Sequence, residues 1–385
     1  MRRIYMDHSA TTPVHPRVAA VVNRFMLSDY GNASSVHHFG KVAREALEDA
    51  RSQVADLIGA DSPSELLFTS GGTESDNLAI KGVAYARRDQ GRHIITSAIE
   101  HQAVLHACDA LEAEGFEITK VGVDGQGRLD PEAVRDAIRG DTILISIMLA
   151  NNEVGTLQPI EEIAAIAKEY DALVHTDAVQ AVGQISVDVE ALGVDLMSLS
   201  GHKMYGPKGV GALYVRRKTP LQPLQNGGHH ERRLRPGTEN VAGIAGMGEA
   251  CLLAKEELAI RNQYLLRLRD RLIDGIMSEI PKVYLNGHPD HRLPNNVNVS
   301  IVGIEGESIL LSLDMKGIAA SSGSACTSGS LEASHCLLAM GLTHEVAHGS
   351  VRFTLGRDNR QEDVDEVIRE LPAIVERLRA MSPLS

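Results

Sequence analysis

The chain has 385 residues, with 38 Lys and Arg against 51 Asp and Glu, which gives a formal net charge of −13. This charge argues against a protein that coats nucleic acids or anionic membranes, because both bind positive surfaces. The four cysteines are too few for a disulfide scaffold, and none lies in a CxxC pair. No apolar run is long enough to span a bilayer, and the first residues lack the apolar region of a secretory signal. We therefore expect a cytoplasmic protein that binds neither nucleic acid nor membrane.

Apolar runs typical of strands alternate with amphipathic helical stretches over the first 215 residues. We expect strands at residues 65–69, 93–97, 116–123, 142–148, 172–176, 194–200 and 211–215. We expect helices between them at residues 73–88, 102–114, 160–169 and from Pro131, with Asp130 as the N-cap of the last. Because Ile, Leu and Val run continuously in the strands, the pattern predicts an α/β fold with a mostly parallel sheet covered on both faces.

The pattern changes after about residue 240. Residues 240–280 read as one long helical region or two abutting helices. Short strands and further helices follow, at residues 296–302, 307–315, 351–355 and 361–378. This mixture predicts a smaller α+β domain. We expect a large domain over residues 14–260 and a small domain formed by residues 1–13 and 261–385.

Three motifs carry candidate chemistry. The turn Ser70-Gly71-Gly72-Thr73 lies between a strand and a helix, where glycines and free helix N–H groups can hold an anion. Asp177 ends a hydrophobic strand, the place where α/β sheets bind ligands. Lys203 follows a strand inside a loop rich in Ser, Gly and His. Alone, each has an ordinary explanation: a strand–helix turn, an N-cap and a solvated lysine. The spacing after Gly201 does not fit a nucleotide-binding P-loop, because Pro207-Lys208 stands where Gly-Lys-Ser/Thr is required.

Together the three motifs predict a pyridoxal 5′-phosphate site. That cofactor needs a lysine for a Schiff base, a carboxylate on its pyridinium nitrogen and donors for its phosphate. Lys203, Asp177 and the Gly71–Thr73 turn meet these needs, and Ser200 and His202 add donors.

At this level of detail the chain resembles the cysteine desulfurases of the nitrogen-fixation and iron–sulfur-cluster assembly branch. The resemblance extends from residue 5 to about residue 365. It rests on the motifs YMDHSATTPVHP, SGGTESDN, EHQAVL, NNEVGT, HTDAVQ, SLSGHKMYGPKGVGALYV, RPGTENV, SSGSACTSGSLEASH and VRFTLGR. It implies a fold-type I, class V aminotransferase architecture with a seven-stranded type of sheet. It also implies a homodimer that takes sulfur from L-cysteine, leaving L-alanine and an enzyme persulfide.

The resemblance implies a role for each matching residue. Lys203 would carry the Schiff base, and Asp177 would pair with the pyridine nitrogen. His101 would stack on the ring and shuttle protons, and Arg352, aided by Asn152, would bind the substrate carboxylate. Thr238 would reach the phosphate of the neighbouring subunit's cofactor. The remaining cofactor ligands would be Gly72, Thr73, Asn152, Gln180, Ser200 and His202.

Cys326 is the candidate nucleophile. It lies in a run of Gly, Ser, Ala and Thr, residues 321–330, which offers no large apolar group for tight packing. We expect its thiolate to take the substrate sulfur and pass it to an iron–sulfur scaffold or another sulfur acceptor. No intrinsic metal site is expected, although Cys326 could share a nascent iron–sulfur cluster with such a scaffold. For Cys108, Cys251 and Cys336 the expectation is a small buried hydrophobic residue.

Other interpretations stay open from the sequence. A class V aminotransferase would not need the cysteine-bearing loop, whereas a selenocysteine lyase uses similar residues. A sulfur-relay scaffold is disfavoured by the complete cofactor constellation. The stretch His344-Glu345-Val346-Ala347-His348 matches the HExxH signature of zinc proteases, but the extended pattern with its third histidine is missing.

Overall fold

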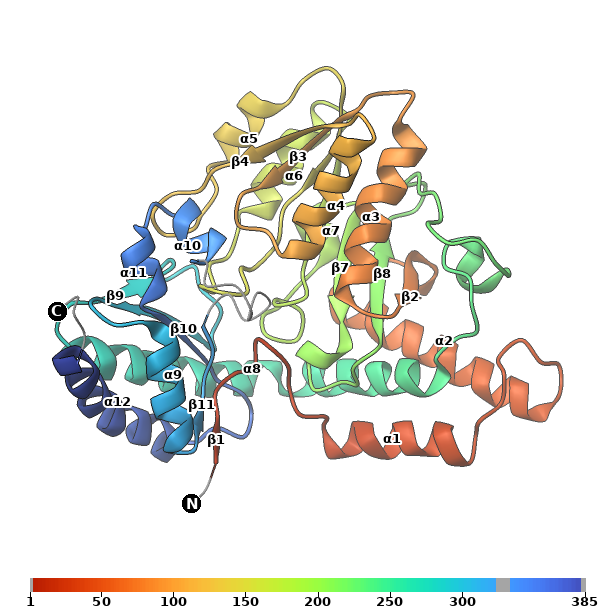
Figure 1. Cartoon of the computed structure of the whole chain (residues 1–385). Coiled ribbons are helices and arrows are strands. Elements are labelled where there is room, and N and C mark those ends of the chain that lie inside the picture. The colour runs from red at the N-terminus through yellow and green to blue at the C-terminus, as the bar shows by residue number, and fades with distance from the viewer. Residues whose placement is uncertain (1–2, 323–332, 382–385) are drawn as a thin grey trace.

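A seven-stranded sheet forms the centre of the computed structural model, which describes residues 3–322 and 333–381 (Figure 1). Its order is β2 (Leu66–Thr69), β8 (Gly211–Val215), β7 (Leu196–Ser200), β6 (Leu173–Asp177), β5 (Thr142–Ser146), β3 (His93–Ser97) and β4 (Glu117–Val121). Strand β8 runs antiparallel to β2 and β7, and the remaining pairs are parallel. The predicted α/β fold with a mostly parallel, seven-stranded sheet is thus confirmed.

Both faces of this sheet are buried, which explains the continuous apolar runs. Neighbouring residues belong to different cores: Leu144 packs in one hydrophobic cluster and Ile145 in the other. Leu196 and Met197 divide in the same way. Side chains alternate between the faces of a strand, so a strand covered on both sides needs apolar residues at every position.

Helices connect the parallel strands and bring their carboxyl ends to one edge. These helices are α3 (Gly72–Arg87), α4 (Gln102–Ala113), α5 (Pro131–Ala137), α6 (Ile160–Lys168) and α7 (Val189–Leu192). Asp130 caps α5 as expected, since its side chain accepts from Glu132 N and Pro131 is the first helical residue. Asp177 and Ser200 end adjacent parallel strands, so both lie at the same edge of the sheet.

A separate hydrophobic core, away from the seven-stranded sheet, forms the small core of the molecule. Strands β9 (Val283–Asn286), β10 (Asn296–Ile301) and β12 (Ser350–Thr354) form an antiparallel sheet, and β1 (Ile4–Tyr5) pairs with β11 (Ile318–Ala319). Helices α9 (Gly306–Met315) and α12 (Gln361–Met381) contribute to the same hydrophobic cluster. Two short helices, α10 (His335–Ala339) and α11 (His344–His348), precede β12. This part has the mixed composition expected of a small α+β domain.

One long helix joins the two cores. Helix α8 (Val241–Glu279) is a single element, and Figure 1 shows it running beneath both sheets. Its first half packs in the large core through Cys251 and its second half in the small core through Leu265. Helices α1 (Pro16–Leu27) and α2 (His38–Ile58) pack against it. A domain boundary near residue 260 therefore falls inside this helix and stays a prediction.

Within residues 3–322 and 333–381, short 3₁₀ segments lie at Pro63–Glu65, Gly201–Lys203 and His230–Arg233. Among the described residues, none of the helices combines the length and apolarity that a membrane crossing requires.

The small core predicts one clear stability effect. Phe353 in β12 is fully buried, so Phe353→Ala should lower the free energy of unfolding by about 3–5 kcal/mol. Phe39→Ala is the matched control, because that ring is 48% exposed. Urea unfolding of both variants measures the difference, and equal losses would contradict the assignment of Phe353 to the core.

Candidate active site

A cavity of about 130 Å³ lies at the carboxyl edge of the large sheet. It is lined by Gly72, Thr73, Asp76, His101, Met148, Ala150, Asn152, Asp177, Val179, Gln180, Ser200, His202 and Lys203. These come from five separate stretches of chain. Of the predicted site residues that the structure describes, only Thr238 and Arg352 lie outside this lining.

The glycine turn lets two chain segments approach closely. A Cβ atom on Gly72 would lie 2.7 Å from Val179 Cγ2, so a larger residue would collide there. Gly71 has φ 154°, a conformation that favours glycine. Among the described residues, no side chain caps the start of α3 at Gly71. The first N–H groups of this helix and the Thr73 hydroxyl are thus suited to an anion.

Asp177 is the carboxylate at the end of β6. Its Oδ1 accepts a hydrogen bond from Val179 N at 2.9 Å, and the residue is buried. Burial raises the pKa of Asp177, whereas its electrostatic interactions with His101 and Lys203 and the hydrogen bond from Val179 N act to lower it. A buried carboxylate in this position calls for a positively charged partner.

Lys203 lies directly after β7, in the segment Gly201–Lys203. Its Nζ donates to the carbonyl oxygens of Ser9 and Ala10, the latter at 3.0 Å. Gln180 Nε2 also donates to Ser9 O, at 3.0 Å. The N-terminal segment therefore positions two predicted cofactor ligands, a contribution that the sequence analysis did not find.

Each of the two histidines that line the cavity, His101 and His202, makes a hydrogen bond through Nδ1. His101 is the N-cap of α4, and its Nδ1 accepts from Ala103 N at 3.1 Å. In the neutral ring the proton therefore resides on Nε2. His202 Nδ1 lies 3.1 Å from Thr11 Oγ1. Burial and the charges of Lys203 and Lys208 lower the pKa of His202 to about 4, so it is neutral near pH 7.

Arg352 does not line the cavity, but it contacts a residue that does. Its Nη1 donates to Asn152 O at 2.8 Å, and its Nη2 donates to Asp7 Oδ1 at 2.9 Å. The residue is 2% exposed, and its Nε has no hydrogen-bond partner among the described residues. A buried guanidinium with a spare donor is suited to a carboxylate ligand.

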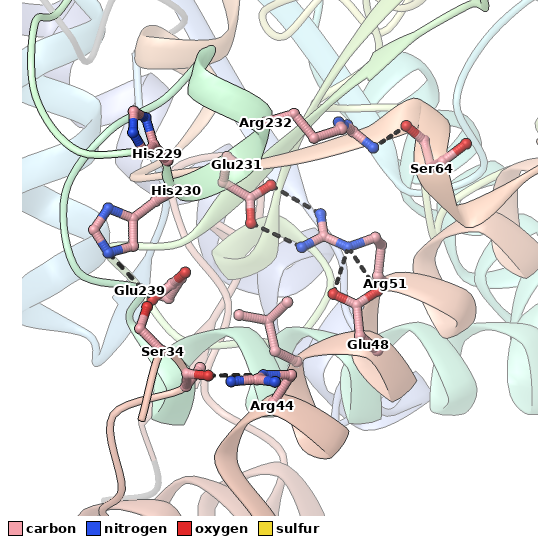
Figure 2. Close-up of a pocket in the computed structure, with 12 residues that line it drawn as sticks. Ser34, Arg44, Glu48, Arg51, Ser64, His229, His230, Glu231, Arg232 and Glu239 are labelled. Carbon is pink, nitrogen blue, oxygen red and sulfur yellow. Dashed lines mark hydrogen bonds and ion pairs between the residues drawn. The ribbon is translucent and has the colours of Figure 1, made fainter. Parts of the chain in front are cut away.

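Thr238 is exposed and is not among the residues that line the cavity. It follows the turn His230–Arg233, which is anchored by the contacts of Glu231 that Figure 2 shows. Glu231 accepts two hydrogen bonds from Arg51, each 2.8 Å, and one from Phe68 N at 2.9 Å. Glu231, Arg232 and Arg233 all have positive φ, which is strained for these residue types. Arg235 continues the anchoring through an ion pair with Glu74, 2.9 Å, at the start of α3.

Cys326 and most of the run 321–330 lie outside the described residues. The expectation that Cys326 shares a nascent iron–sulfur cluster falls on the same residues. The other three cysteines are free and buried, as expected. Burial raises the pKa of Cys108 and of Cys251 to about 12 and that of Cys336 well above its usual range. Their thiols are therefore poor nucleophiles.

The HExxH stretch forms the short helix α11, with both histidines exposed. Over residues 3–322 and 333–381, the group whose ligand atoms lie within 4.8 Å of one another is instead Glu153, His335 and Cys336. His335 Nε2 is 3.0 Å from Glu100 O, and Ser334 Oγ donates to Glu153 Oε2 at 2.5 Å. These contacts fix α10 against the neighbouring turn, and nothing supports a zinc-protease centre at α11.

The sequence of this chain is similar to those of a known family over almost its full length. The model of the family described as "Aminotransferase class-V" matches residues 4–367. A protein named "Cysteine desulfurase IscS" from Methanosarcina thermophila is 56% identical over 384 residues, covering 100% of this chain and 95% of the relative. One of the same name from Haemophilus influenzae is 52% identical over 386 residues, with 99% and 95% covered. The chain belongs to the class V aminotransferases, in the branch of the IscS cysteine desulfurases.

Solved structures with related sequences have the same fold as this chain. A "NIFS-LIKE PROTEIN" superposes with a TM-score of 0.92 at 40% identity, covering 98% of this chain and 100% of that one. A structure described as "SspA in complex with cysteine" has a TM-score of 0.81 at 37% identity, with 91% and 98% covered. The family membership and the fold expected from the motifs are both confirmed.

The anchored turn in Figure 2 predicts a second stability effect. Arg51→Met would leave Glu231 buried without its cation, and should cost about 3–5 kcal/mol of unfolding free energy. Arg135→Met is the control, since its partner Glu169 is 55% exposed, and its loss should be much smaller. Urea unfolding tests both, and an Arg51→Met loss no larger than the control would contradict the role of this pair.

Proposed function

We propose that the protein is a pyridoxal 5′-phosphate-dependent cysteine desulfurase that converts L-cysteine into L-alanine and a persulfide on Cys326. The observation that carries this proposal is the cavity that gathers Lys203, Asp177 and the Gly72–Thr73 turn. Its amine, buried carboxylate and anion donors are the three kinds of group that the cofactor requires. The family names support the activity, and the structure described with cysteine supports the substrate class.

The residues present fit the cofactor. Gly72, Thr73, Ser200 and His202 would hold its phosphate, with His202 acting as a neutral donor because its pKa is about 4. Asp177 would pair with the ring nitrogen, which supplies the cation that this buried carboxylate calls for. His101 would cover the ring, and Asn152 and Gln180 would bond its phenolic oxygen. When bound, the cofactor withdraws electrons from the substrate Cα and so makes its proton acidic.

Lys203 and His101 would handle the protons. Lys203 would form the Schiff base with the cofactor and, as a neutral amine at the cavity wall, would remove the Cα proton of the substrate. The carbonyl oxygens of Ser9 and Ala10 then stabilise the resulting ammonium group. His101 holds its proton at Nε2, because Nδ1 accepts from Ala103 N. From Nε2, His101 can donate that proton to a group inside the cavity. The same nitrogen can afterwards accept the proton of the substrate thiol.

Arg352 would bind the α-carboxylate of the substrate. Its guanidinium is already oriented by Asn152 O and Asp7, and its buried Nε is without a partner among the described residues. A carboxylate at Nε and Nη2 would make the bidentate contact that arginine favours, in competition with Asp7.

Cys326 would then attack the substrate sulfur as a thiolate. A sulfur–sulfur bond forms and the Cβ–S bond breaks, and the electron pair of that bond stays with Cβ, which takes up a proton to give alanine. The product is a persulfide on Cys326, and a reducing compartment such as the cytoplasm would keep the Cys326 thiol out of disulfides before it takes up sulfur.

The persulfide would pass to an iron–sulfur scaffold protein or another sulfur acceptor, in line with the names of the relatives. We further propose a homodimer. The exposed position of Thr238, on a segment anchored through Glu231 and Arg235, supports a contact with the neighbouring subunit's cofactor phosphate.

The nucleophile is tested by Cys326→Ala, with Cys336→Ala as the matched control at a buried thiol. We expect Cys326→Ala to keep the absorption band of the bound cofactor and to lose persulfide formation and sulfide release. Cys336→Ala should keep all three. Normal desulfuration by Cys326→Ala would refute the proposed mechanism.

The carboxylate contact is tested by Arg352→Lys. Loss of the bidentate contact should raise KM for L-cysteine by about 10–100-fold, the equivalent of 1.5–3 kcal/mol for a charged hydrogen bond. The cofactor band should stay, because Arg352 does not line the cofactor cavity. Arg357→Lys, a nearby arginine that lies over the Tyr205 ring, is the control. An unchanged KM for Arg352→Lys would contradict the assignment.

A further inference from the structure

Asp76 is a second carboxyl group in the cavity, and the mechanism above gives it no role. It lies one turn after Thr73 on α3, is 1% exposed and lines the cavity together with Asp177. Its Oδ1 is buried without a hydrogen-bond partner among the described residues. Two buried carboxyl groups that line one cavity cannot both carry a negative charge without a large electrostatic cost.

Among the described residues, the groups that act most strongly on Asp76 are neutral or acidic. His175 on β6 lies 3.7 Å from Asp76 Oδ1, but burial lowers its pKa to about 3, so the ring is neutral. Hydroxyl groups occupy both of its nitrogens, Ser146 Oγ at 2.8 Å and Ser198 Oγ at 3.0 Å. The charged neighbours that act most strongly on Asp76 are Asp177 and Glu100, both acidic.

Asp177 is the better of the two sites for a negative charge. Val179 N donates to it, and its electrostatic interactions with His101 and Lys203 lower its pKa. Asp76 has a hydrogen bond from Ser198, while burial and the charges of Asp177 and Glu100 raise its pKa well above the usual range. An unpartnered buried oxygen is also far less costly on a neutral acid than on a carboxylate.

We propose that Asp76 is a positioning residue whose carboxyl group stays protonated and neutral, so that the single negative charge of the pair resides on Asp177. The inference rests on the proposed function, since that charge is the partner of the cofactor's ring nitrogen. A charged Asp76 would spread the negative potential over the cavity, toward the phosphate end. A neutral Asp76 keeps it at the end of β6.

The apoprotein tests this without cofactor or turnover. An acid that stays protonated in the folded state lowers stability as pH rises above its unfolded value, because only the unfolded chain then releases the proton. Between about pH 5 and pH 8, the unfolding equilibrium constant of the native protein should rise relative to that of Asp76→Asn, by up to about tenfold per pH unit. Asp49→Asn, the same replacement at an exposed helical position, supplies the baseline. A ratio that stays flat, or that falls with pH, would overturn the proposal.

A spectroscopic measurement covers the case in which Asp76→Asn does not fold. Infrared spectra of the apoprotein labelled with ¹³C-aspartate should show the carbonyl stretch of a protonated aspartic acid near pH 7, and Asp177→Asn should retain it. The label separates this band from that of Glu100, whose buried carboxyl group has a pKa of about 8. The absence of a labelled band, or its loss in Asp177→Asn, would overturn the proposal.

Titration with pyridoxal phosphate distinguishes the proposed neutral state of Asp76 from the proposed cofactor role of Asp177. Asp177→Asn should weaken cofactor binding at least tenfold more than Asp76→Asn does. Equal weakening by both variants would show that Asp76 carries charge toward the cofactor and would overturn the proposal. If Asp177→Asn binds like the native protein while the stability effect at Asp76 holds, the neutral state of Asp76 stands and the proposed cofactor role of Asp177 fails.

Discussion

A buried carboxyl group at the end of β6, Asp177, is the central constraint on the site. Burying a carboxylate is costly unless a cation or several donors compensate, and the strand register leaves Asp177 where water cannot do so. Val179 N–H, His101 and Lys203 compensate in part, and a protonated ring nitrogen would complete the compensation. Burial also keeps His175 and His202 neutral, and we place the second carboxyl group of the cavity, Asp76, in its neutral form.

The fold meets this constraint by bringing distant segments to a single edge. Parallel strands with helical crossovers place the ends of β6 and β7 side by side, so Asp177 and the segment with Lys203 face the same cavity. The close approach of Gly72 to Val179 closes the anion end. The second part of the molecule contributes from the side, because β12 carries Arg352 to Asn152. Helix α8 holds the two cores in one frame.

The parts of the site that depend on local sequence could be predicted. Asp177 and the lysine segment follow from hydrophobic strands that end in polar residues, and the Gly71-Gly72 turn follows from a strand–helix junction. The contacts that hold these groups could not. Lys203 bonds to Ser9 and Ala10, more than 190 positions away in the chain, and no periodicity indicates that pairing. The Arg352–Asp7 ion pair is likewise a product of the tertiary fold. Asp76 stood inside a quoted motif, but only its burial beside Asp177 distinguishes it from a solvated helical carboxylate.

The protonation state of the cofactor's ring nitrogen shows whether Asp177 carries the buried negative charge. Nitrogen-15 NMR of the protein loaded with pyridoxal phosphate labelled at the ring nitrogen reports whether that nitrogen carries a proton. If the charge resides on Asp177, the native protein should show a pyridinium signal near neutral pH, and Asp177→Asn should show a neutral pyridine. A neutral ring nitrogen in the native protein would contradict the account.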